Sequence, residues 1–521
     1  MPGLMAFALV AIACCHRSES STEPTGFEIT VLDAHNDPVP CRIHLRDANG
    51  RIWKSGAWPS FDDHFVYVGT AMFPLQPGSY AYEVERGSEY QRLRGSFQVA
   101  EKGTKVLRLR IERIADLGQD GWYSGDLHIH RRPEDVPLLM RAEDIRVGPV
   151  VTWWNGSNPY IEASAQGPVR FDGDRWMDAT AGEDERQGGA VLYFRLAKPL
   201  TLPPPMRDDK GEITHRQGDE RDEYPAAASF ARTARAQVGA HIDIEKPFWW
   251  DMPTWIALDL ADSVGIAHNH MTRASLHNGE AWGKPRDPKI YGDDPGGDGY
   301  WTQDIYYQIL NAGIRLAPSA GSASGVLPNP VGYNRVYVHL DGPFDYDAWW
   351  GGLKAGHSFV TNGPILLVSA NGKLPGHVFE TNAAKLDIAL ETRVFSNEGV
   401  GRVELVRDGH IVQRGSHHAD GGAISFAPVR FEQSGWFLVR TIADRNDNFR
   451  FASTAPFYVA IKPDQRRISR SAVNFFLAWL KERMSLLQAG TMPSDKLESV
   501  VAFHREAERF WQQQLARANA E

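Results

Sequence analysis

The feature that most constrains the fold is a change in hydrophobic patterning along the chain. Residues 26–32 and 386–390 alternate between apolar and polar side chains, which is typical of strands with one buried face. Between these regions, residues 147–152 and 263–267 are short apolar runs separated by long polar and aromatic stretches. Such runs are typical of the buried strands of an α/β domain. The pattern predicts an α/β domain flanked by two β-sandwich domains.

The end of the chain has a helical period instead. Val473, Phe476 and Leu480 fall at i, i+3 and i+7, as on one face of a helix. The pattern breaks at Pro493, and Ser494 is expected to be the N-cap of a second helix. The chain is therefore predicted to comprise a leader and linker (1–25), a β-sandwich (26–115), a β/α domain (116–364), a second β-sandwich (365–462) and a helical hairpin (463–521).

Composition narrows the functional classes. The chain has 521 residues, of which 42% are hydrophobic and 23% charged, as in ordinary globular proteins. Its 56 Lys and Arg against 65 Asp and Glu leave a net charge of −9, so no nucleic-acid partner is expected. A mean hydropathy of −0.39 argues against a polytopic membrane protein. Charges of both signs are concentrated in residues 206–223, which we expect to form a solvated surface insertion.

The start of the chain indicates export. Its apolar run, residues 4–13, is too short to span a bilayer but suits the core of a signal peptide. The following Cys14 and Cys15 resemble a lipoprotein processing site, so periplasmic or cell-surface location with an N-terminal lipid on one of them is expected. The alternative is a buried amphipathic segment. Only Cys41 remains beyond them, so any metal must be held by histidines and carboxylates.

The strongest local signal for chemistry is the motif GDLHIH at residues 125–130. Because alternate residues of a strand share a face, His128 and His130 are expected to point the same way and to chelate one cation. Asp126 lies on that face and is expected to orient a ligating imidazole. Imidazole ligands suit zinc, iron or nickel, and added carboxylates extend the choice to manganese. The alternative is that the two histidines are only neighbours on the surface.

This motif resembles the opening metal motif of polymerase-and-histidinol-phosphatase (PHP) domains, and in particular of the CehA/McbA family of metallohydrolases, which carries flanking β-domains. The resemblance covers about residues 116–460 and continues in GE at 182–183, GAH at 239–241, YQILNAG at 307–313, AGS at 320–322 and LKAGHSFVTNGP at 353–364. It implies a distorted β/α barrel with a metal site at the C-terminal ends of its strands.

The resemblance assigns residues unevenly. His128 and His130 match the paired histidines of the first metal, and Glu183 matches the bridging carboxylate, with Glu185 as a competitor. His241 matches a later metal-binding histidine. Three family positions lack their ligands, where this chain has TWW at 152–154, GA at 189–190 and GSASG at 321–325. These losses imply that a third metal is absent and a second is weakened, so a standard trinuclear phosphoesterase is not expected.

Replacement ligands follow on later predicted strands. His241, Asp243 and Glu245 alternate along one strand and therefore share a face. A second HxH pair, His268 and His270, follows an apolar run, where barrel enzymes recruit ligands. We expect one divalent cation (Zn, Mn or Fe), or two if these residues complete a second site. The alternatives are hydrogen-bonded loop histidines for the pair and salt bridges for the two carboxylates.

A bound metal would define the chemistry. It would lower the pKa of a bound water towards ~7 and polarise an acyl or phosphoryl oxygen of the substrate. Glu183, Glu185 or Asp243 is then expected to act as base or proton shuttle. The residues expected to contact substrate are Trp154, Trp249 and Trp250, as aromatic walls, and Tyr333 and Arg335, beside an anionic group. Burial in the barrel core is the alternative for the tryptophans.

Two functions follow from these expectations. The first is an exported metal-dependent hydrolase of an ester, carbamate, amide or phosphoester bond in a small-molecule or glycan-like substrate. The second is a surface protein that keeps the barrel, has lost catalysis and binds a ligand such as a glycan. The two HxH motifs and Glu183 favour the first function, and the missing ligands at 321–325 favour the second. The oligomeric state is left open.

Overall fold

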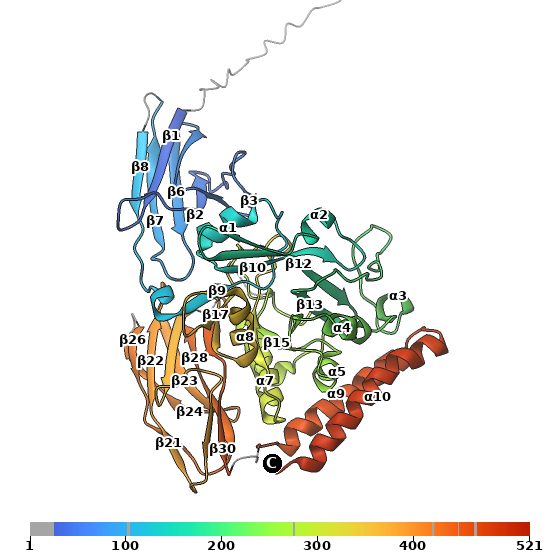
Figure 1. Ribbon diagram of the computed structural model, residues 1–521. Helices are drawn as coiled ribbons and strands as arrows, with labels where there is room; N and C mark the ends of the chain where they lie inside the picture. Colours follow the sequence, from blue (N-terminus) through green and yellow to red (C-terminus); the bar gives the residue numbers. More distant parts are fainter. Residues whose placement is uncertain (1–24, 102–104, 275–276, 419–420, 446, 463–465) are drawn as a thin grey trace, which may run out of the picture.

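The chain folds into three strand-containing units and a pair of long helices (Figure 1). The computed structural model describes residues 25–521 except 102–104, 275–276, 419–420, 446 and 463–465. The predicted leader, with Cys14 and Cys15, lies outside the described residues. None of the helices in the described part of the chain is both long and apolar enough to span a membrane. The fold is mixed α/β and rich in strands, as the sequence predicted.

The N-terminal unit (blue in Figure 1) consists of two sheets that share one core. Its strands are β1 (Thr25–Leu32), β2 (Cys41–Asp47), β3 (Ser60–Phe61), β4 (His64–Tyr67), β5 (Thr70–Leu75), β6 (Gly78–Glu85), β7 (Leu93–Val99) and β8 (Lys105–Arg110). The sheet orders are β5-β1-β8 and β3-β4-β2-β6-β7. Phe27, Ile29 and Val31 alternate into the core, as their spacing predicted, and Cys41 is buried there as a free thiol.

The middle unit alternates strands with helices. Its strands are β9 (Trp122–Gly125), β10 (Val147–Trp154), β11 (Pro168–Phe171), β12 (Arg175–Arg186), β13 (Gly189–Phe194), β14 (His241–Ile244), β15 (Ser263–Ala267), β16 (Ala317–Ala320), β17 (Arg335–His339) and β18 (Ser358–Thr361). Its helices are η1 (Leu117–Asp120, a 3-10 turn), α1 (Val136–Glu143), α2 (Ile161–Ser164), α3 (Glu220–Glu223), α4 (Ala227–Arg235), α5 (Met252–Ala257), α6 (Pro288–Tyr291), α7 (Pro295–Asn311) and α8 (Tyr346–Ala355). The apolar runs at 147–152 and 263–267 form strands, as predicted.

The strands of the middle unit form one sheet in the order β16-β15-β14-β13-β12-β10-β9-β17-β18. From β9 to β16, all neighbouring pairs are parallel except the two that involve β13. The two ends of this stretch meet, because the N–H of Leu127, just after β9, donates to the carbonyl of Ala320 at 3.1 Å. The segments that follow β9, β14, β15 and β16 therefore gather at one end of the sheet. A PHP-type barrel remains a prediction.

The C-terminal unit (orange in Figure 1) is built only of strands. They are β19 (Ile365–Ala370), β20 (Val378–Thr381), β21 (Leu386–Ile388), β22 (Leu390–Phe395), β23 (Val400–Arg407), β24 (His410–Arg414), β25 (Ser416–His418), β26 (Gly421–Ser425), β27 (Val429–Phe431), β28 (Gly435–Ala443), β29 (Phe451–Thr454) and β30 (Phe457–Ile461). One sheet has the order β19-β22-β26-β25, and β29-β28-β23-β24 extends the long sheet from β18. The sheet is thus continuous across the predicted boundary at 364.

The predicted helical hairpin is confirmed: it consists of α9 (Arg470–Gln488) and α10 (Ser494–Arg517). It lies along the middle unit (red in Figure 1), where Val473, Phe476 and Leu480 join the core of that unit. The expected cap is wrong in detail, because Ser494 is the first residue of α10 and Pro493 occupies the N-cap position without a side-chain hydrogen bond.

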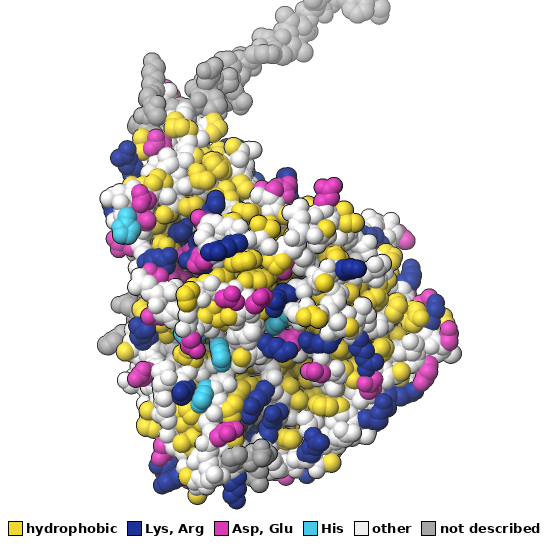
Figure 2. Space-filling model, in the orientation of Figure 1, with side chains coloured by type: hydrophobic (Ala, Val, Ile, Leu, Met, Phe, Trp, Pro, Cys, Tyr) yellow, Lys and Arg dark blue, Asp and Glu magenta, His cyan; other side chains and the backbone are white. Residues whose placement is uncertain are grey.

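The prediction that residues 206–223 form a solvated insertion is confirmed for the exposed residues 207–212 but wrong for the end of the segment, where Asp219, Asp222 and Glu223 are buried. Glu223 is buried and accepts hydrogen bonds from Arg483 of α9, at 2.9 Å (Oε1) and 2.6 Å (Oε2). Arg483 is fully buried and also donates to Asp251 at 2.7 Å. The sequence suggested solvation because the cation that neutralises these two carboxylates lies far along the chain. Elsewhere, Lys and Arg side chains are interspersed with Asp and Glu over the face drawn in Figure 2.

Candidate metal centre

Three side chains converge just beyond the C-terminal end of β9. His128 Nε2 lies 2.9 Å from His130 Nε2 and 3.4 Å from Glu183 Oε2, and His130 Nε2 lies 3.2 Å from the same oxygen. Ligand atoms about 2.0–2.1 Å from a tetrahedral zinc ion are roughly 3.3 Å apart. The three side chains, which we call the His128 cluster, therefore have the spacing and donor types of a metal site, and the prediction that His128 and His130 point the same way is confirmed.

Backbone contacts explain why the HxH pair faces one point. Ile129, between the two histidines, makes parallel bridges to Val150 and Ser324, which hold the segment extended between neighbouring strands. Asp126 accepts hydrogen bonds from the N–H groups of His128 (3.1 Å) and Ser322 (3.0 Å). It accepts a third from the N–H of Gly332 at 2.6 Å. Its predicted role of orienting an imidazole is therefore wrong, because these contacts are to the main chain. Residues 321–325 lack the ligands that the resemblance implies. They contribute instead a backbone N–H, that of Ser322, which holds Asp126.

Glu183 is positioned by β12 and by Asn155, which no sequence motif indicated. Asn155, at the end of β10, donates from its N–H to the Glu183 carbonyl at 2.9 Å. Its side-chain amide exchanges two hydrogen bonds with the backbone of Glu185, at 2.8 and 2.9 Å. Asn155 has a positive φ of 48°, a conformation that asparagine tolerates better than most residues. It therefore holds the backbone of the two glutamates of β12, Glu183 and Glu185.

Glu245 approaches the cluster from the side opposite Glu183. Its Oε1 lies 3.6 Å from His128 Nδ1 and is buried without a hydrogen-bond partner among the described residues. Its Oε2 accepts hydrogen bonds from Lys246 and from the indole N–H of Trp249, the latter at 3.1 Å. A carboxylate on the far nitrogen is the usual partner of a metal-ligating imidazole.

The pKa shifts follow from burial and these contacts. Burial alone would raise the pKa of Glu183, but the two adjacent imidazoles outweigh it and hold that pKa well below its usual range. Burial opposes protonation of His128, yet Glu183 and Glu245 outweigh burial and raise its pKa. For Glu185, burial and then the charge of Glu183 raise the pKa to about 8. Glu185 therefore holds a proton at higher pH than Glu183 does.

The structure does not bring His241 to the cluster, so its assignment as a ligand is wrong. Its Nε2 lies 2.8 Å from Ser263 Oγ, and its ring packs against Phe194 and Trp350. His241 and Asp243 lie on β14 and Glu245 directly follows its end, but alternate residues are about 6.6 Å apart along a strand. His241 therefore lies two such steps below Glu245, at the other end of the strand.

Asp243 occupies the level between His241 and Glu245. Its carboxylate accepts hydrogen bonds from the hydroxyl groups of Ser263 and Ser319. Burial raises its pKa to about 7, against the effect of these two hydrogen bonds. The nearby charges that affect this pKa include those of Glu245 and His128. One carboxylate oxygen of Asp243, Oδ1, is thus already engaged by two serine hydroxyl groups.

The second HxH pair forms a separate group. His268 and His270 follow β15, and the potential ligand grouped with them is Asp298, which no sequence motif indicated. His268 Nε2 lies 2.9 Å from the hydroxyl oxygen of Thr302. The pair therefore does not complete the His128 cluster.

Of the three tryptophans predicted to contact substrate, one lies beside the His128 cluster and two lie in the core. Trp154 is partly exposed, and its ring centroid lies 5.2 Å from that of His130. Trp249 is fully buried and serves as a hydrogen-bond donor to Glu245. Trp250 packs against Trp479 of α9 and donates to a backbone carbonyl. Contact with substrate is therefore wrong for Trp249 and Trp250, because side chains further along the chain cover both.

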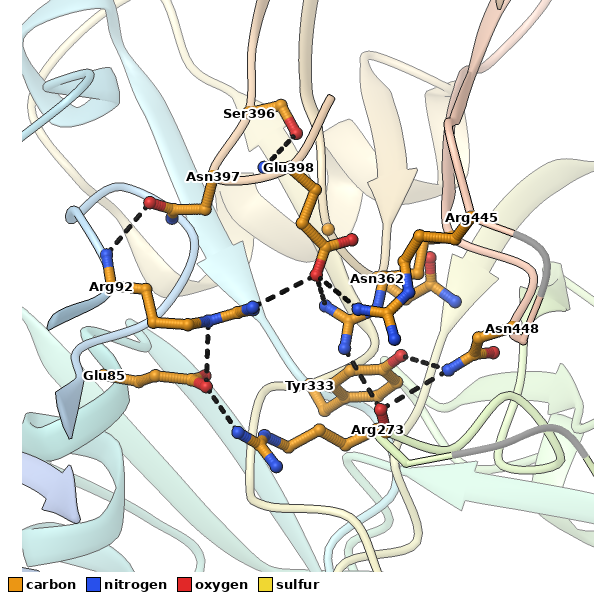
Figure 3. A network of polar contacts seen from close by, with 12 residues as sticks. Glu85, Arg92, Arg273, Tyr333, Asn362, Ser396, Asn397, Glu398, Arg445 and Asn448 are labelled. Atoms are coloured by element: carbon orange, nitrogen blue, oxygen red, sulfur yellow. Dashed lines mark hydrogen bonds and ion pairs between the residues drawn. The ribbon is translucent and has the colours of Figure 1, made fainter. Parts of the chain in front are cut away.

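Tyr333 and Arg335 lie at the junction of the three units rather than at the cluster. Arg335 is buried and donates to the carbonyls of Gly332 and Glu143, at 2.6 and 3.1 Å. Tyr333 donates to the carbonyl of Thr272 and lies within the polar network of Figure 3. Their predicted contact with an anionic substrate group is therefore wrong.

Figure 3 shows how that junction is held. Glu398 of the C-terminal unit contacts Arg92 of the N-terminal unit at 3.1 Å, and Arg92 in turn contacts Glu85 at 3.1 Å. Arg273 of the middle unit also donates to Glu85, at 2.8 Å. The chain of ion pairs joins all three units. Burial raises the pKa of a carboxylate, but Arg42 and Arg92 outweigh it and hold the pKa of Glu85 at about 2.

The donor set of the His128 cluster fits a divalent transition metal. Two imidazole nitrogens and one carboxylate are the ligands of many catalytic zinc sites, and the fourth position is left for water or substrate. The buried, unpartnered Oε1 of Glu245 behind His128 suits the same arrangement. A scan against protein-family models and a search of the curated proteins find no match to this chain.

Proposed function

We propose that this protein is a metal-dependent hydrolase of the PHP type, similar to the CehA/McbA family, with His128, His130 and Glu183 as ligands of one catalytic divalent cation. The observation that carries the proposal is the convergence of these three ligand atoms, with pairwise separations of 2.9–3.4 Å. The candidate cations are Zn, Mn and Fe, because imidazole and carboxylate donors suit all three.

A cation held there supplies an activated water with a pKa near ~7 and polarises an acyl or phosphoryl oxygen. The protein's own residues supply the other functions. Glu245 orients the imidazole of His128, and Glu185 is the group that transfers a proton. Trp154 forms the apolar wall of the substrate site beside His130. Such a wall favours a small organic ester, carbamate, amide or phosphoester over free phosphate.

Export with an N-terminal lipid is part of the same proposal. It rests on the apolar run at 4–13 followed by Cys14 and Cys15. Labelling of the full chain with a radioactive fatty acid tests it. Incorporation that is lost in the double variant Cys14→Ser/Cys15→Ser supports lipidation, and equal incorporation in both proteins contradicts it.

The second function, ligand binding without catalysis, is favoured by one observation. The segment at 321–325 holds backbone and serine groups where the PHP pattern places an aspartate and a histidine, so fewer than the full set of ligands surround the cluster. The binding protein would use the same cluster and the Trp154 wall to hold a glycan-like ligand.

Metal analysis with a substrate panel separates the two functions. We expect purified protein to carry metal, and the variant His128→Asn/His130→Asn to lose one equivalent together with hydrolysis of aryl esters, carbamates or phosphates. The control is His241→Asn, which keeps that equivalent because His241 lies away from the cluster. A metal content that is unchanged in the double variant contradicts the proposal. Metal-bound protein that hydrolyses nothing but binds a saccharide supports the second function.

A further inference from the structure

A second group of metal-binding side chains lies at the end of β15. One ligand atom from each of His268, His270 and Asp298 lies within 4.8 Å of the other two. His268 Nε2 is 3.7 Å from Asp298 Oδ2. The two histidines follow β15, and Asp298 lies in the first turn of α7. We call these three residues the His268 cluster, and it shares no residue with the His128 cluster.

Four polar atoms of this cluster lack hydrogen-bond partners among the described residues. Both carboxylate oxygens of Asp298 are buried without a hydrogen bond among the described residues, and so is Nδ1 of His268 and of His270. Asp298 is 0% exposed and His268 is 1% exposed. Buried polar atoms in folded proteins nearly always have a partner, and a buried carboxylate is costly unless something neutralises it. Four buried atoms without partners within one group of potential ligands therefore favour a cation site.

The surroundings also fit a closed cation site. Asp298 lies at the N-terminal end of a 17-residue helix, whose dipole favours the ionised carboxylate. The ring of Phe248 packs against the imidazoles of His268 and His270, with centroids at 5.4 and 5.8 Å, and forms an apolar wall. The positive charge of Lys246 acts on His268 and opposes a cation at this cluster. Lys246 is paired with Glu245, whose carboxylate offsets that charge.

We propose that His268, His270 and Asp298 bind a second divalent cation, of the zinc class, independently of the His128 cluster. Two imidazoles and a carboxylate leave one position of a tetrahedron for water or for the hydroxyl of Thr302, which lies 2.9 Å from His268 Nε2. The cation ties the segment after β15 to α7. Because His268 and Asp298 are buried and His270 is only partly exposed, its role is to hold these elements together.

Zinc stoichiometry of the full chain tests this site. Metal-depleted protein is reconstituted with Zn²⁺, and the bound ions are counted by native mass spectrometry. We expect two ions in the wild type, one in Asp298→Asn, one in His128→Asn/His130→Asn and none in the combined variant. The matched control is His277→Asn, an exposed histidine whose ring lies 6.0 Å from that of His270, which keeps two ions.

The outcomes separate this inference from the proposed function. A single ion that disappears in His128→Asn/His130→Asn overturns the second site and leaves the proposed function intact. A single ion that disappears only in Asp298→Asn supports the second site and overturns the catalytic metal. Two ions in Asp298→Asn, or no ion in the wild type, overturn the second site. If Asp298→Asn fails to fold, His270→Gln and the wild-type count decide the question.

Discussion

His128 presents one ring nitrogen to the metal-binding face and the other to Glu245: its Nε2 is 3.4 Å from Glu183 Oε2, and its Nδ1 is 3.6 Å from Glu245 Oε1. A carboxylate in this place sets which nitrogen carries the proton and raises the basicity of the ligating one. Glu245 is itself held by Lys246 and Trp249, so its position is defined before a metal binds.

Replacing this carboxylate should weaken metal binding without removing a ligand. We expect Glu245→Gln to lower metal affinity about 10- to 100-fold, the usual cost of losing such a partner. Competition with a chromophoric chelator measures the affinity directly. Glu162→Gln, an exposed glutamate on α2, is the matched control and should bind metal like the wild type. Unchanged affinity in Glu245→Gln would show that Glu245 does not act on His128.

Gly321 limits the space behind the same imidazole. A Cβ atom at this position would lie 2.5 Å from Cβ of His128, which is closer than such atoms approach, so Gly321→Ala must displace His128. We expect at least about a tenfold loss of metal affinity, because ligand atoms must stay within about 0.2 Å of their ideal distances. Gly342→Ala, where a Cβ meets nothing within 4 Å, is the control. Equal affinities in the two variants would contradict this account of His128.

The hairpin is held to the middle unit by one buried and one exposed set of ion pairs. Losing the buried set should lower the free energy of unfolding more than losing the exposed pair. Arg483→Met leaves Glu223 and Asp251 buried without their cation, which costs about 3–5 kcal/mol of unfolding free energy. Arg232→Met removes an exposed pair with Glu506 of α10 and should cost about 0–1 kcal/mol. Urea unfolding followed by tryptophan fluorescence compares them. Similar losses in both variants would refute the distinction.

His504 of α10 makes the hairpin sensitive to acid. Burial lowers its pKa to about 4, against the attraction of Asp251 and with the repulsion of Arg483, whereas an unfolded histidine has a pKa of about 6.5. Between these values the unfolded chain binds more protons, so the free energy of unfolding falls as pH falls, by up to about 1.4 kcal/mol per pH unit from this group.

The variant His504→Asn should therefore show a shallower fall between pH 6.5 and pH 4 than the wild type. Urea unfolding at several pH values across this window measures the slope. His357→Asn, at an exposed position, is expected to leave the slope unchanged. A slope in His504→Asn as steep as in the wild type would assign the acid sensitivity to other groups.

Local patterns in the sequence predicted several strands, the helix α9 and the two histidines of the His128 cluster. The apolar runs became strands, the i, i+3, i+7 stripe became α9, and His128 and His130 converged because alternate residues of an extended segment share a face. The same rule placed His241 and Glu245 on one face of β14. It could not say which of them would reach the level of His128, because the stagger of neighbouring strands sets that level.

The tertiary structure alone decided which charged groups meet. Glu183 reaches His128 across 55 residues of sequence, and Glu223 meets Arg483 across 260. Asp298 reaches the histidines after β15 only because α7 packs beside that strand. Periodicity is a property of a few consecutive residues and can be read from them. A pairing between distant carboxylates and cations depends on how the whole sheet closes and where the helices pack against it, so no local pattern contains it.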